Sequence, residues 1–588
     1  MKKTVMERKS WVVIQALFLY TWLVNLKNTD SFYSVYLLCA AAGALCLCDN
    51  ARNQTSLSRG NRILVYILAG MFAIATTLAN YPLFEPVTAL LNTANVCCCL
   101  IGGFIIGYHV LVCVIRRFPL DAAGMRAEGK HACLFYIACF GFLAAVYLAY
   151  LFSTGYPVYL AHDSLVSMEQ VKTGIYSNNH PYWYTRFIGL CLHLGYWLFS
   201  DVNAACATYS TVQSVLLAAC LSYSVVTLYQ AKMPLWTVGV TVFLYGFLPY
   251  NLTYSITMWK DTLFGGCSVV VITALYRILQ GIGKSSKANY IAFLIGGMGF
   301  CLVRNNGLPV FLAWTVLMVL FLGKRHKKLL VVALFIIVFA WAMTGPVLEL
   351  LEVVDGEIVE ILAVPFQQIA RVIATGGTVS EPDMEILEKI FSIEQVKIKY
   401  SPEIVDPIKF ESMQPKGQAY LLEHMGQFLS LWLRVGLQNP GAYLKAWVEL
   451  TKGFWNGGYY FWIYIRTTWY DTTGIGGFEM QNIGRRLFDA LFRYTEKPTV
   501  FEPLYSIGLQ VWIILCCGFA CLAQKRKQWL IAVPMVINAV GLWFITPVYA
   551  EFRYAYPFFV TCPVILFTTL FQGDSKEEQA GSALEETT

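Results

Sequence analysis

Apolar runs of roughly 20 residues recur along the chain from Trp11 to Phe571, separated by short polar or basic segments. A helix needs roughly 20 mostly apolar residues to cross about 30 Å of hydrocarbon. Backbone polar groups cannot be left unpaired in lipid, and the runs lack the alternation of a barrel strand, so each run is expected to be an α-helix. The pattern predicts an all-α polytopic membrane protein.

Basic clusters between the runs indicate how the chain is threaded, because short loops rich in Lys and Arg stay in the cytoplasm. Six clusters are assigned to that side, at 2–9, 52–62, 116–130, 284–287, 324–328 and 525–527. The apolar runs then alternate correctly only if one of them does not cross. The best candidate is 184–200, which carries Arg186 and His193 and is rich in interfacial aromatic residues, so it is expected to lie along the outer membrane surface. This leaves about 14 transmembrane helices.

Two long polar segments then share the outer face: a first outer loop at 153–203 and the segment 347–503. The second holds 20 of the 36 acidic residues, and it is expected to be a mainly α extracytoplasmic domain because an unstructured loop of this length is unusual. The predicted organisation is N-terminal additional transmembrane helices at 1–131, a transmembrane core at 132–346, the extracytoplasmic domain at 347–503, C-terminal transmembrane helices at 504–572 and a disordered tail at 573–588.

The composition agrees with a membrane protein. Hydrophobic residues make up 57% of the 588 residues and charged residues 13%, against roughly 25% charged in soluble domains, which excludes an ordinary soluble enzyme. The net charge of +7 is scattered in short clusters between apolar runs, so no nucleic-acid partner is predicted. Nearly all of the 18 cysteines lie in apolar runs and form neither a disulfide framework nor a metal pattern.

Five polar clusters fall on the outer side under this topology. Their residues with available chemistry are Asp163, Glu169 and His180 in 160–185, Lys260 and Asp261 in TMWKDTLFGG, Arg304 and Asn305 in CLVRNNGLPVF, Gln368 and Arg371 in VPFQQIARVIATGG, and Arg553 in ITPVYAEFRYAYP. Four of these clusters also have a plain structural interpretation: a solvated connecting loop, a snorkelling lysine, a polar turn, and a surface ion pair between Glu551 and Arg553.

One carboxylate with several cations suits a membrane-anchored phosphate. A lipid phosphate leaves readily when Lys or Arg stabilises its developing charge, whereas an acceptor hydroxyl needs a base. The predicted roles are Asp163 as the catalytic base, Lys260, Arg304, Arg371 and Arg553 as donor-phosphate ligands, and Glu169, His180, Asp261, Asn305 and Gln368 as substrate-binding residues.

These residues carry a resemblance that covers roughly 132–572. The chain resembles an uncharacterised bacterial group of polytopic proteins in the GT-C glycosyltransferase superfamily, through Asp163, His180-Pro181, Thr185, Trp259-Lys260-Asp261, Arg304-Asn305-Asn306-Gly307, Pro365 to Arg371 and Arg553-Tyr554. The resemblance implies a GT-C-like helical bundle, Asp163 as the acidic residue of the first outer loop, and 184–200 as a juxtamembrane helix. Many GT-C members carry a paired acidic motif there, whereas this chain has the lone carboxylate of His162-Asp163-Ser164. No metal site and no cofactor are therefore predicted, although a divalent cation stays possible.

The expected function is that of a bacterial, multi-pass cell-membrane glycosyltransferase with its catalytic face outside the cytoplasm. It would move a sugar, with inversion, from a polyprenyl-phosphate donor to an extracytoplasmic glycan, polymer or protein acceptor, amid membrane lipids. The alternatives are a lipid or solute transporter or flippase, a polysaccharide polymerase or ligase, and a non-enzymatic assembly or sensor protein. Transporters usually have internal repeats and broken helices, and no repeat is visible in this sequence.

Overall fold

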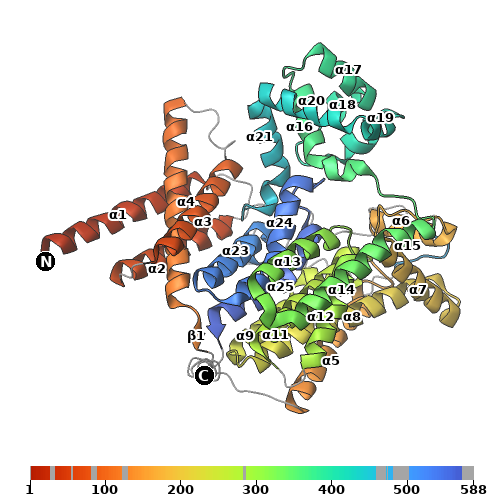
Figure 1. Cartoon of the computed structure of the whole chain (residues 1–588), viewed down its shortest axis with the longest axis horizontal. Helices are drawn as coiled ribbons and strands as arrows, with labels where there is room; N and C mark the ends of the chain where they lie inside the picture. Colours follow the sequence, from red (N-terminus) through yellow and green to blue (C-terminus); the bar gives the residue numbers. More distant parts are fainter. Residues whose placement is uncertain are drawn as a thin grey trace.

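The fold is almost entirely helical (Figure 1). The computed structural model describes residues 2–26, 33–53, 57–80, 89–121, 130–282, 286–458, 472, 475–480 and 502–572. The predicted tail at 573–588 and much of 459–501 lie outside the described residues.

Long apolar helices dominate the structure. Among the described residues, seven are long and apolar enough to cross a membrane: Tyr33–Arg52, Arg59–Ala79, Leu90–Arg117, Lys130–Thr154, Val202–Gln230, Lys260–Gln280 and Lys327–Leu350. An eighth span results if α9 (Leu235–Phe247) and α10 (Pro249–Ile256), which meet at a bend of 52°, are counted as one. The chain is therefore an all-α polytopic membrane protein, as its hydrophobic pattern predicts.

The first four helices form a group of their own at one side of the molecule (Figure 1). They are α1 (Lys2–Asn25), α2 (Tyr33–Arg52), α3 (Arg59–Ala79) and α4 (Ala89–Arg117). In α4, Gly103 and Gly107 lie against Ala73 and Ala69 of α3, where an added Cβ atom would come within 3.0 Å and 2.9 Å of their Cα atoms. Small residues of this kind let membrane helices approach closely. This group packs on the main bundle through α23.

The main bundle is built around α11, which packs against α8, α12 and α25. Its helices are α5 (Lys130–Thr154), α8 (Val202–Gln230), α9, α10, α11 (Lys260–Gln280), α12 (Ser286–Leu302), α13 (Gly307–Leu322), α14 (Lys327–Thr344), α23 (Ile507–Ala523), α24 (Val533–Ile545) and α25 (Phe552–Leu570). At 1.5 Å per residue, the 21 residues of α11 extend roughly 30 Å and so connect two opposite ends of the bundle.

We call these two ends the site end and the basic end. The site end is made of residues 156–163, 176–180, 256–261, 304–306 and 546–553, and it includes the first residue of α11. At the basic end, Arg277 near the end of α11 donates to Gln230 of α8, with 2.7 Å between Nη1 and Oε1. Strand β1 (Leu120–Asp121) pairs there in parallel with β2 (Phe571–Gln572). Helices α11 and α25 therefore both begin at the site end and finish at the basic end.

Helices α6 (His162–Thr173) and α7 (Tyr182–Phe199) belong to the site end. Helix α7 runs along the first half of α8: its Phe187 ring lies 5.8 Å from that of Tyr209, and its Gly195 lies against Ala205 and Thr208. Because α8 begins at Val202, α7 ends beside the start of α8 and not at the basic end. This course suits a helix that lies at a membrane surface, and its place relative to a bilayer stays a prediction.

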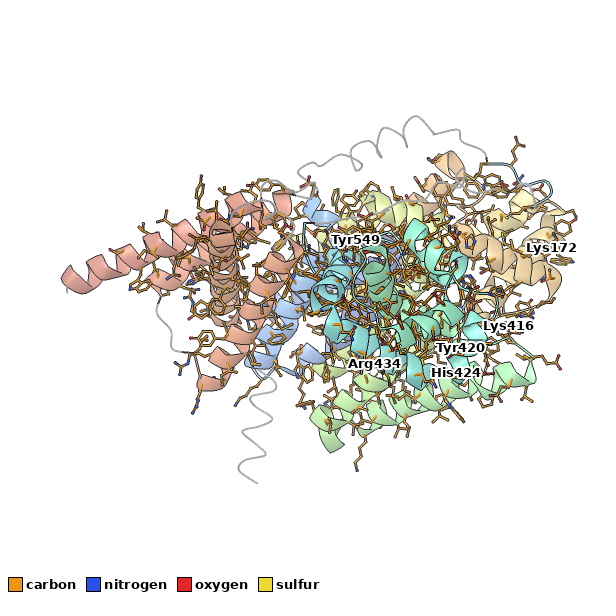
Figure 2. All side chains as sticks on the ribbon, turned by 90° about the horizontal axis from the view of Figure 1, so that it is seen from above. Lys172, Lys416, Tyr420, His424, Arg434 and Tyr549 are labelled. Carbon is orange, nitrogen blue, oxygen red and sulfur yellow. The ribbon has the colours of Figure 1, made fainter. Side chains whose placement is uncertain are left out.

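Between α14 and α23 the chain forms a smaller helical unit with its own hydrophobic core, which runs from Val359 to Tyr443. We call residues 353–443 the loop domain. Helix α15 (Pro346–Leu350) precedes it and α21 (Pro440–Thr451) leads out of it; its other helices are α16 (Ala363–Ala374), α17 (Glu381–Ile390), α18 (Ile393–Lys399), α19 (Gly417–Glu423) and α20 (Met425–Gln438). Seen from above, these helices lie over the middle of the bundle (Figure 2).

Candidate functional site

A short backbone ladder brings the start of α6 beside the start of α11. The Tyr159 N–H donates to the Ile256 carbonyl at 3.0 Å, and the Met258 N–H donates to the Tyr159 carbonyl at 2.9 Å. The Ser164 hydroxyl donates to the Met258 carbonyl at 2.8 Å. These bonds fix the first turn of α6 against the segment that leads into α11.

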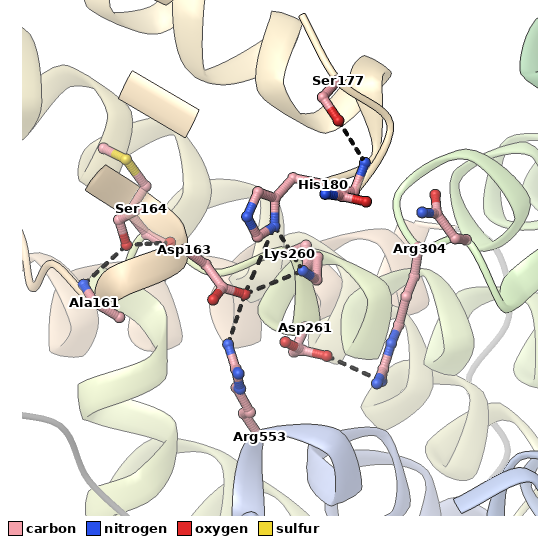
Figure 3. A network of polar contacts seen from close by, with 12 residues as sticks. Ala161, Asp163, Ser164, Ser177, His180, Lys260, Asp261, Arg304 and Arg553 are labelled. Atoms are coloured by element: carbon pink, nitrogen blue, oxygen red, sulfur yellow. Dashed lines mark hydrogen bonds and ion pairs between the residues drawn. The ribbon is translucent and has the colours of Figure 1, made fainter. Parts of the chain in front are cut away.

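Asp163 is consequently the centre of a charged cluster (Figure 3). Its Oδ2 atom lies 3.1 Å from Lys260 Nζ and 2.7 Å from Arg553 Nη1. His180 Nδ1 lies 3.8 Å from the same oxygen and 3.2 Å from Lys260 Nζ. Lys260 and Arg553 are 97 and 390 residues away from Asp163 along the chain, so the fold assembles this cluster.

Three helices begin at this cluster. Asp163 is the second residue of α6, Lys260 the first of α11 and Arg553 the second of α25. The N-terminus of a helix carries a partial positive charge and unpaired N–H groups, which favour bound anions. The helix ends and the two cations therefore make this point strongly attractive to negative charge, and Asp163 supplies that charge within the protein.

Arg553 is held on several sides. Its Nε contacts Glu551 Oε1, and its Nη2 donates to the Tyr554 hydroxyl at 3.1 Å. Its guanidinium lies 5.5 Å from the centre of the Trp259 ring and 4.9 Å from that of Tyr554. A planar guanidinium can bridge two carboxylates while it stacks on aromatic rings, which an ammonium group cannot do. Arg553 thus joins the carboxylates of Asp163 and Glu551.

The charges in the cluster control one another. Burial raises the pKa of the Asp163 carboxyl, but the positive charges of Arg553 and Lys260 outweigh burial and hold that pKa well below its usual value. Burial and the charge of Lys260 lower the pKa of His180 to about 4, so the imidazole is neutral near pH 7. Because an ammonium group only donates, the neutral His180 accepts at Nδ1 from Lys260.

A second ion pair lies next to the first (Figure 3). Arg304 Nη1 lies 2.9 Å from Asp261 Oδ1, and the Asp261 side chain is fully buried. The Arg304 guanidinium lies 5.1 Å from the centre of the Tyr554 ring, so the same ring contacts both Arg304 and Arg553. Gly307 closes the turn after Arg304, where an added Cβ atom would overlap the carbonyl oxygen of Phe300 at 1.9 Å. A residue larger than glycine would push this turn open.

The structure brings some of the predicted residues together and gives the others different partners. Asn305 lies at the edge of the site and donates to the Asn178 carbonyl at 2.8 Å. Arg371 does not contact Asp163: it pairs with Glu449 and donates to the Tyr400 hydroxyl at 3.2 Å. The other two residues lie outside the cluster: Gln368 accepts from Trp432 Nε1 at 2.8 Å, and the exposed Glu169 lies 3.8 Å from Lys172. Of the four predicted phosphate ligands, Lys260 and Arg553 contact Asp163 directly.

Glu551 is a site residue that the sequence interpretation did not assign. The ion pair of Glu551 with Arg553 is present, but its expected place at the surface is wrong, because the Glu551 side chain is only 5% exposed. Burial raises the pKa of its carboxyl, an effect that the charge of Arg553 opposes. The spacing of two residues to Arg553 was visible in the sequence, whereas the burial that makes the pair important was not. Trp259 and Tyr554 stack on Arg553. In the sequence they only adjoin Lys260 and Arg553, and nothing there indicates the stacking.

No group of three His, Cys, Asp or Glu side chains suited to a metal ion occurs among the described residues. In the cluster Lys260 Nζ lies within hydrogen-bond distance of both ligand-type groups, Asp163 and His180, and its positive charge would oppose a bound cation. The charges of Lys260 and Arg553 are matched within the cluster by those of Asp163 and Glu551.

Fold and site together define a class: a polytopic, all-α membrane protein in which three helix N-termini meet at a charged cluster centred on Asp163. Comparison with family models adds that residues 166–583 match a family of unknown function, DUF6020, and the chain belongs to that family. The match includes His180, Lys260, Arg304 and Arg553, and it leaves out the first four helices, α5 and Asp163. Comparison with curated proteins and with solved structures gave no match.

Acidification should destabilise the site end. The pKa of His180 is about 4 in the folded protein and about 6.5 in an unfolded chain, so the unfolded state binds more protons between these values. Stability due to this group is therefore present at pH 7 and is lost as the pH falls toward 4. Lowering the pH from 7 to 5 should cost about 2 kcal/mol through His180. The measurement is the apparent melting temperature of the detergent-solubilised protein at both pH values. His180→Gln should reduce the difference, and an unchanged difference would contradict the assignment.

Proposed function

We propose that this protein is a membrane glycosyltransferase of GT-C type that moves a sugar, with inversion, from a polyprenyl-phosphate donor to an extracytoplasmic acceptor. The site end is placed outside, because described residues of the basic clusters, such as Arg116 and Arg526, lie at the basic end. Fourteen helices cross the membrane: the eight long spans with the bent pair counted once, the five shorter apolar helices and α25.

The observation that carries the proposal is the meeting of three helix N-termini and two cations on one carboxylate. Lys260 and Arg553 both bind Asp163 Oδ2, and the site lies in a membrane protein at the end of its bundle. The phosphodiester that joins the sugar to the polyprenyl chain in such a donor carries one negative charge. It would therefore compete with Asp163 for Lys260 and Arg553. The same helix ends that favour Asp163 would favour the phosphate oxygens.

The chemistry follows from this competition. The acceptor hydroxyl oxygen attacks the anomeric carbon of the sugar, the bond from that carbon to the phosphate oxygen breaks, and polyprenyl phosphate leaves with the electron pair. Asp163 takes the hydroxyl proton. With both cations bound to it, Asp163 is a weak base; when Lys260 and Arg553 turn to the phosphate, its pKa rises and it becomes able to accept a proton. A single displacement inverts the configuration at the anomeric carbon.

Transport is the second candidate, and one observation favours it. Helices α9 and α10 form a broken span with a bend of 52°, a feature common at the substrate sites of transporters. In this protein, however, carbonyls next to the break are bonded from inside: the Asn251 amide donates to the Leu244 carbonyl at 2.9 Å, and the Tyr147 hydroxyl donates to the Tyr245 carbonyl at 2.8 Å. A break bonded in this way leaves fewer backbone groups for an ion or solute.

Mass spectrometry of lipids that co-purify with the protein tests the proposed function. We expect a polyprenyl monophosphate sugar with the wild type, and at least a tenfold loss of it in Lys260→Met, because a charge-assisted bond to phosphate contributes roughly 1.5 to 3 kcal/mol. Lys172→Met is the matched control, since Lys172 is exposed and lies 3.8 Å from Glu169. Equal amounts of lipid in both variants, or a bound ion or nutrient in place of the lipid, would contradict the proposal.

A further inference from the structure

The loop domain contacts the bundle beside His180. The Asn178 N–H donates to the Val354 carbonyl at 2.8 Å, and the Val354 N–H donates to the Tyr176 carbonyl at 3.0 Å. The Asn179 side chain completes this contact, because its Oδ1 accepts from the Glu357 N–H at 2.6 Å. His180 is the next residue, so the contact fixes the loop that presents the imidazole.

The loop domain also contacts the bundle just before Glu551 and Arg553. The Val405 N–H donates to the Pro547 carbonyl at 3.0 Å, and the Tyr549 N–H donates to the Glu403 carbonyl at 2.7 Å. Between them Ile404 and Val548 form an antiparallel bridge. Tyr549 lies beneath the loop-domain helices in the view from above (Figure 2). This second contact fixes the turn that leads into α25.

One hydrophobic core joins the two contacts. Val359, two residues after Glu357, is 1% exposed, and Val405 is fully buried in the same core. Cores of this kind are close-packed and move as units, since a shift of one member disturbs all its neighbours. The loop with His180 and the turn with Arg553 are therefore attached to a single body, although they come from distant parts of the chain.

We infer that the loop domain is a two-point clamp that holds His180 and Arg553 in position around Asp163, and that Asn179 is the positioning residue of the first point. Asn179 has this role because its side chain accepts the hydrogen bond from the Glu357 N–H. Asn178, in contrast, bonds through its backbone alone: its N–H donates to Val354 and its carbonyl accepts from Asn305. The inference deepens the proposed function and rests on it for its use in catalysis. The clamp itself can be measured without any assay of transfer.

Hydrogen exchange followed by mass spectrometry on the full-length protein tests the clamp. Asn179→Ala should speed exchange about fivefold at the Glu357 amide, the factor that corresponds to one ordinary hydrogen bond, and should also speed it at Tyr549, which the second contact protects. Asn178→Ala is the matched control and should leave both amides unchanged.

Asn179→Asp keeps an acceptor oxygen and should restore the wild-type pattern. Faster exchange confined to the first contact would overturn the clamp, and no change at either contact would overturn the role of Asn179.

A second readout reports position within the site. Nitrogen NMR of labelled histidines, with His180→Gln to assign the signal, gives the pKa of His180. In Asn179→Ala this pKa should rise from about 4 toward its ordinary value of about 6.5, because the ring leaves Lys260. A pKa that stays at about 4 in this variant would overturn the positioning role. Both readouts can succeed when no polyprenyl lipid co-purifies, which would refute the transferase alone; a bound lipid with neither change would refute the clamp alone.

Discussion

Asp163→Asn is expected to abolish sugar transfer and at the same time to tighten binding of the lipid phosphate. Asparagine keeps the shape of the side chain but cannot accept the acceptor proton, and a general base contributes roughly 10²- to 10⁴-fold to a rate. It also removes the negative charge that Lys260 and Arg553 neutralise at 3.1 and 2.7 Å in the wild type. Lys260 then loses its carboxylate partner and Arg553 keeps only Glu551, so both cations should bind the phosphate more strongly.

Two measurements are needed: the transfer rate with the co-purified donor, and the affinity for polyprenyl phosphate in vesicles. Glu169→Gln is the matched control, because Glu169 lies on the same helix as an exposed carboxylate and should change neither value. Near-normal turnover in Asp163→Asn would remove the proposed base. Weaker phosphate binding in that variant would show that the cations do not serve the phosphate.

Arg553→Met is expected to cost both stability and phosphate binding. Arg553 joins Asp163 and Glu551, so its loss leaves two mostly buried carboxylates without their shared partner; removing one member of such a group typically costs about 3 to 5 kcal/mol. Arg553→Lys should recover only part of this loss, because an ammonium group cannot bridge the two carboxylates and stack on Trp259.

The checks for Arg553 are the apparent melting temperature in detergent and the affinity for polyprenyl phosphate. Arg186→Met serves as the control. Arg186 of α7 lies over the rings of Tyr176 and Tyr182, and it forms no ion pair with Asp163 or Glu551. Unchanged stability in Arg553→Met would contradict the joint pairing. Full recovery of phosphate affinity by Arg553→Lys would contradict the need for a planar guanidinium.

Much of the architecture was predictable from the sequence because a bilayer imposes one strong constraint on each segment. The length of an apolar run decides that it is a helix, and most of the runs from Tyr33 to Leu350 became helices at their expected places. The division of 235–256 into α9 and α10 was not predicted, since carbonyls next to the bend take partners from other helices, such as the Tyr147 hydroxyl of α5 that donates to the Tyr245 carbonyl.

The site was predictable in its central residues and not in its full membership. Asp163, His180, Lys260 and Arg553 stood out because charged residues at the ends of apolar helices need a reason. Arg371 and Gln368 stood out in the same way, yet they have other partners: Glu449 of α21 pairs with Arg371, and Trp432 of the loop domain donates to Gln368. Residue type alone could not distinguish the residues of the cluster from Arg371 and Gln368, because both sets are polar groups beside an apolar stretch of sequence.

By itself, the sequence determined that the chain is a helical membrane protein and that its unusual charges lie near the ends of helices, because hydrophobicity and charge act locally and are written residue by residue. Only the tertiary structure decided that Lys260 and Arg553 share one oxygen of Asp163, that Glu551 is buried beside them, and that one core holds the loops of His180 and Arg553. Those facts depend on contacts between residues up to 390 positions apart, which no local pattern encodes.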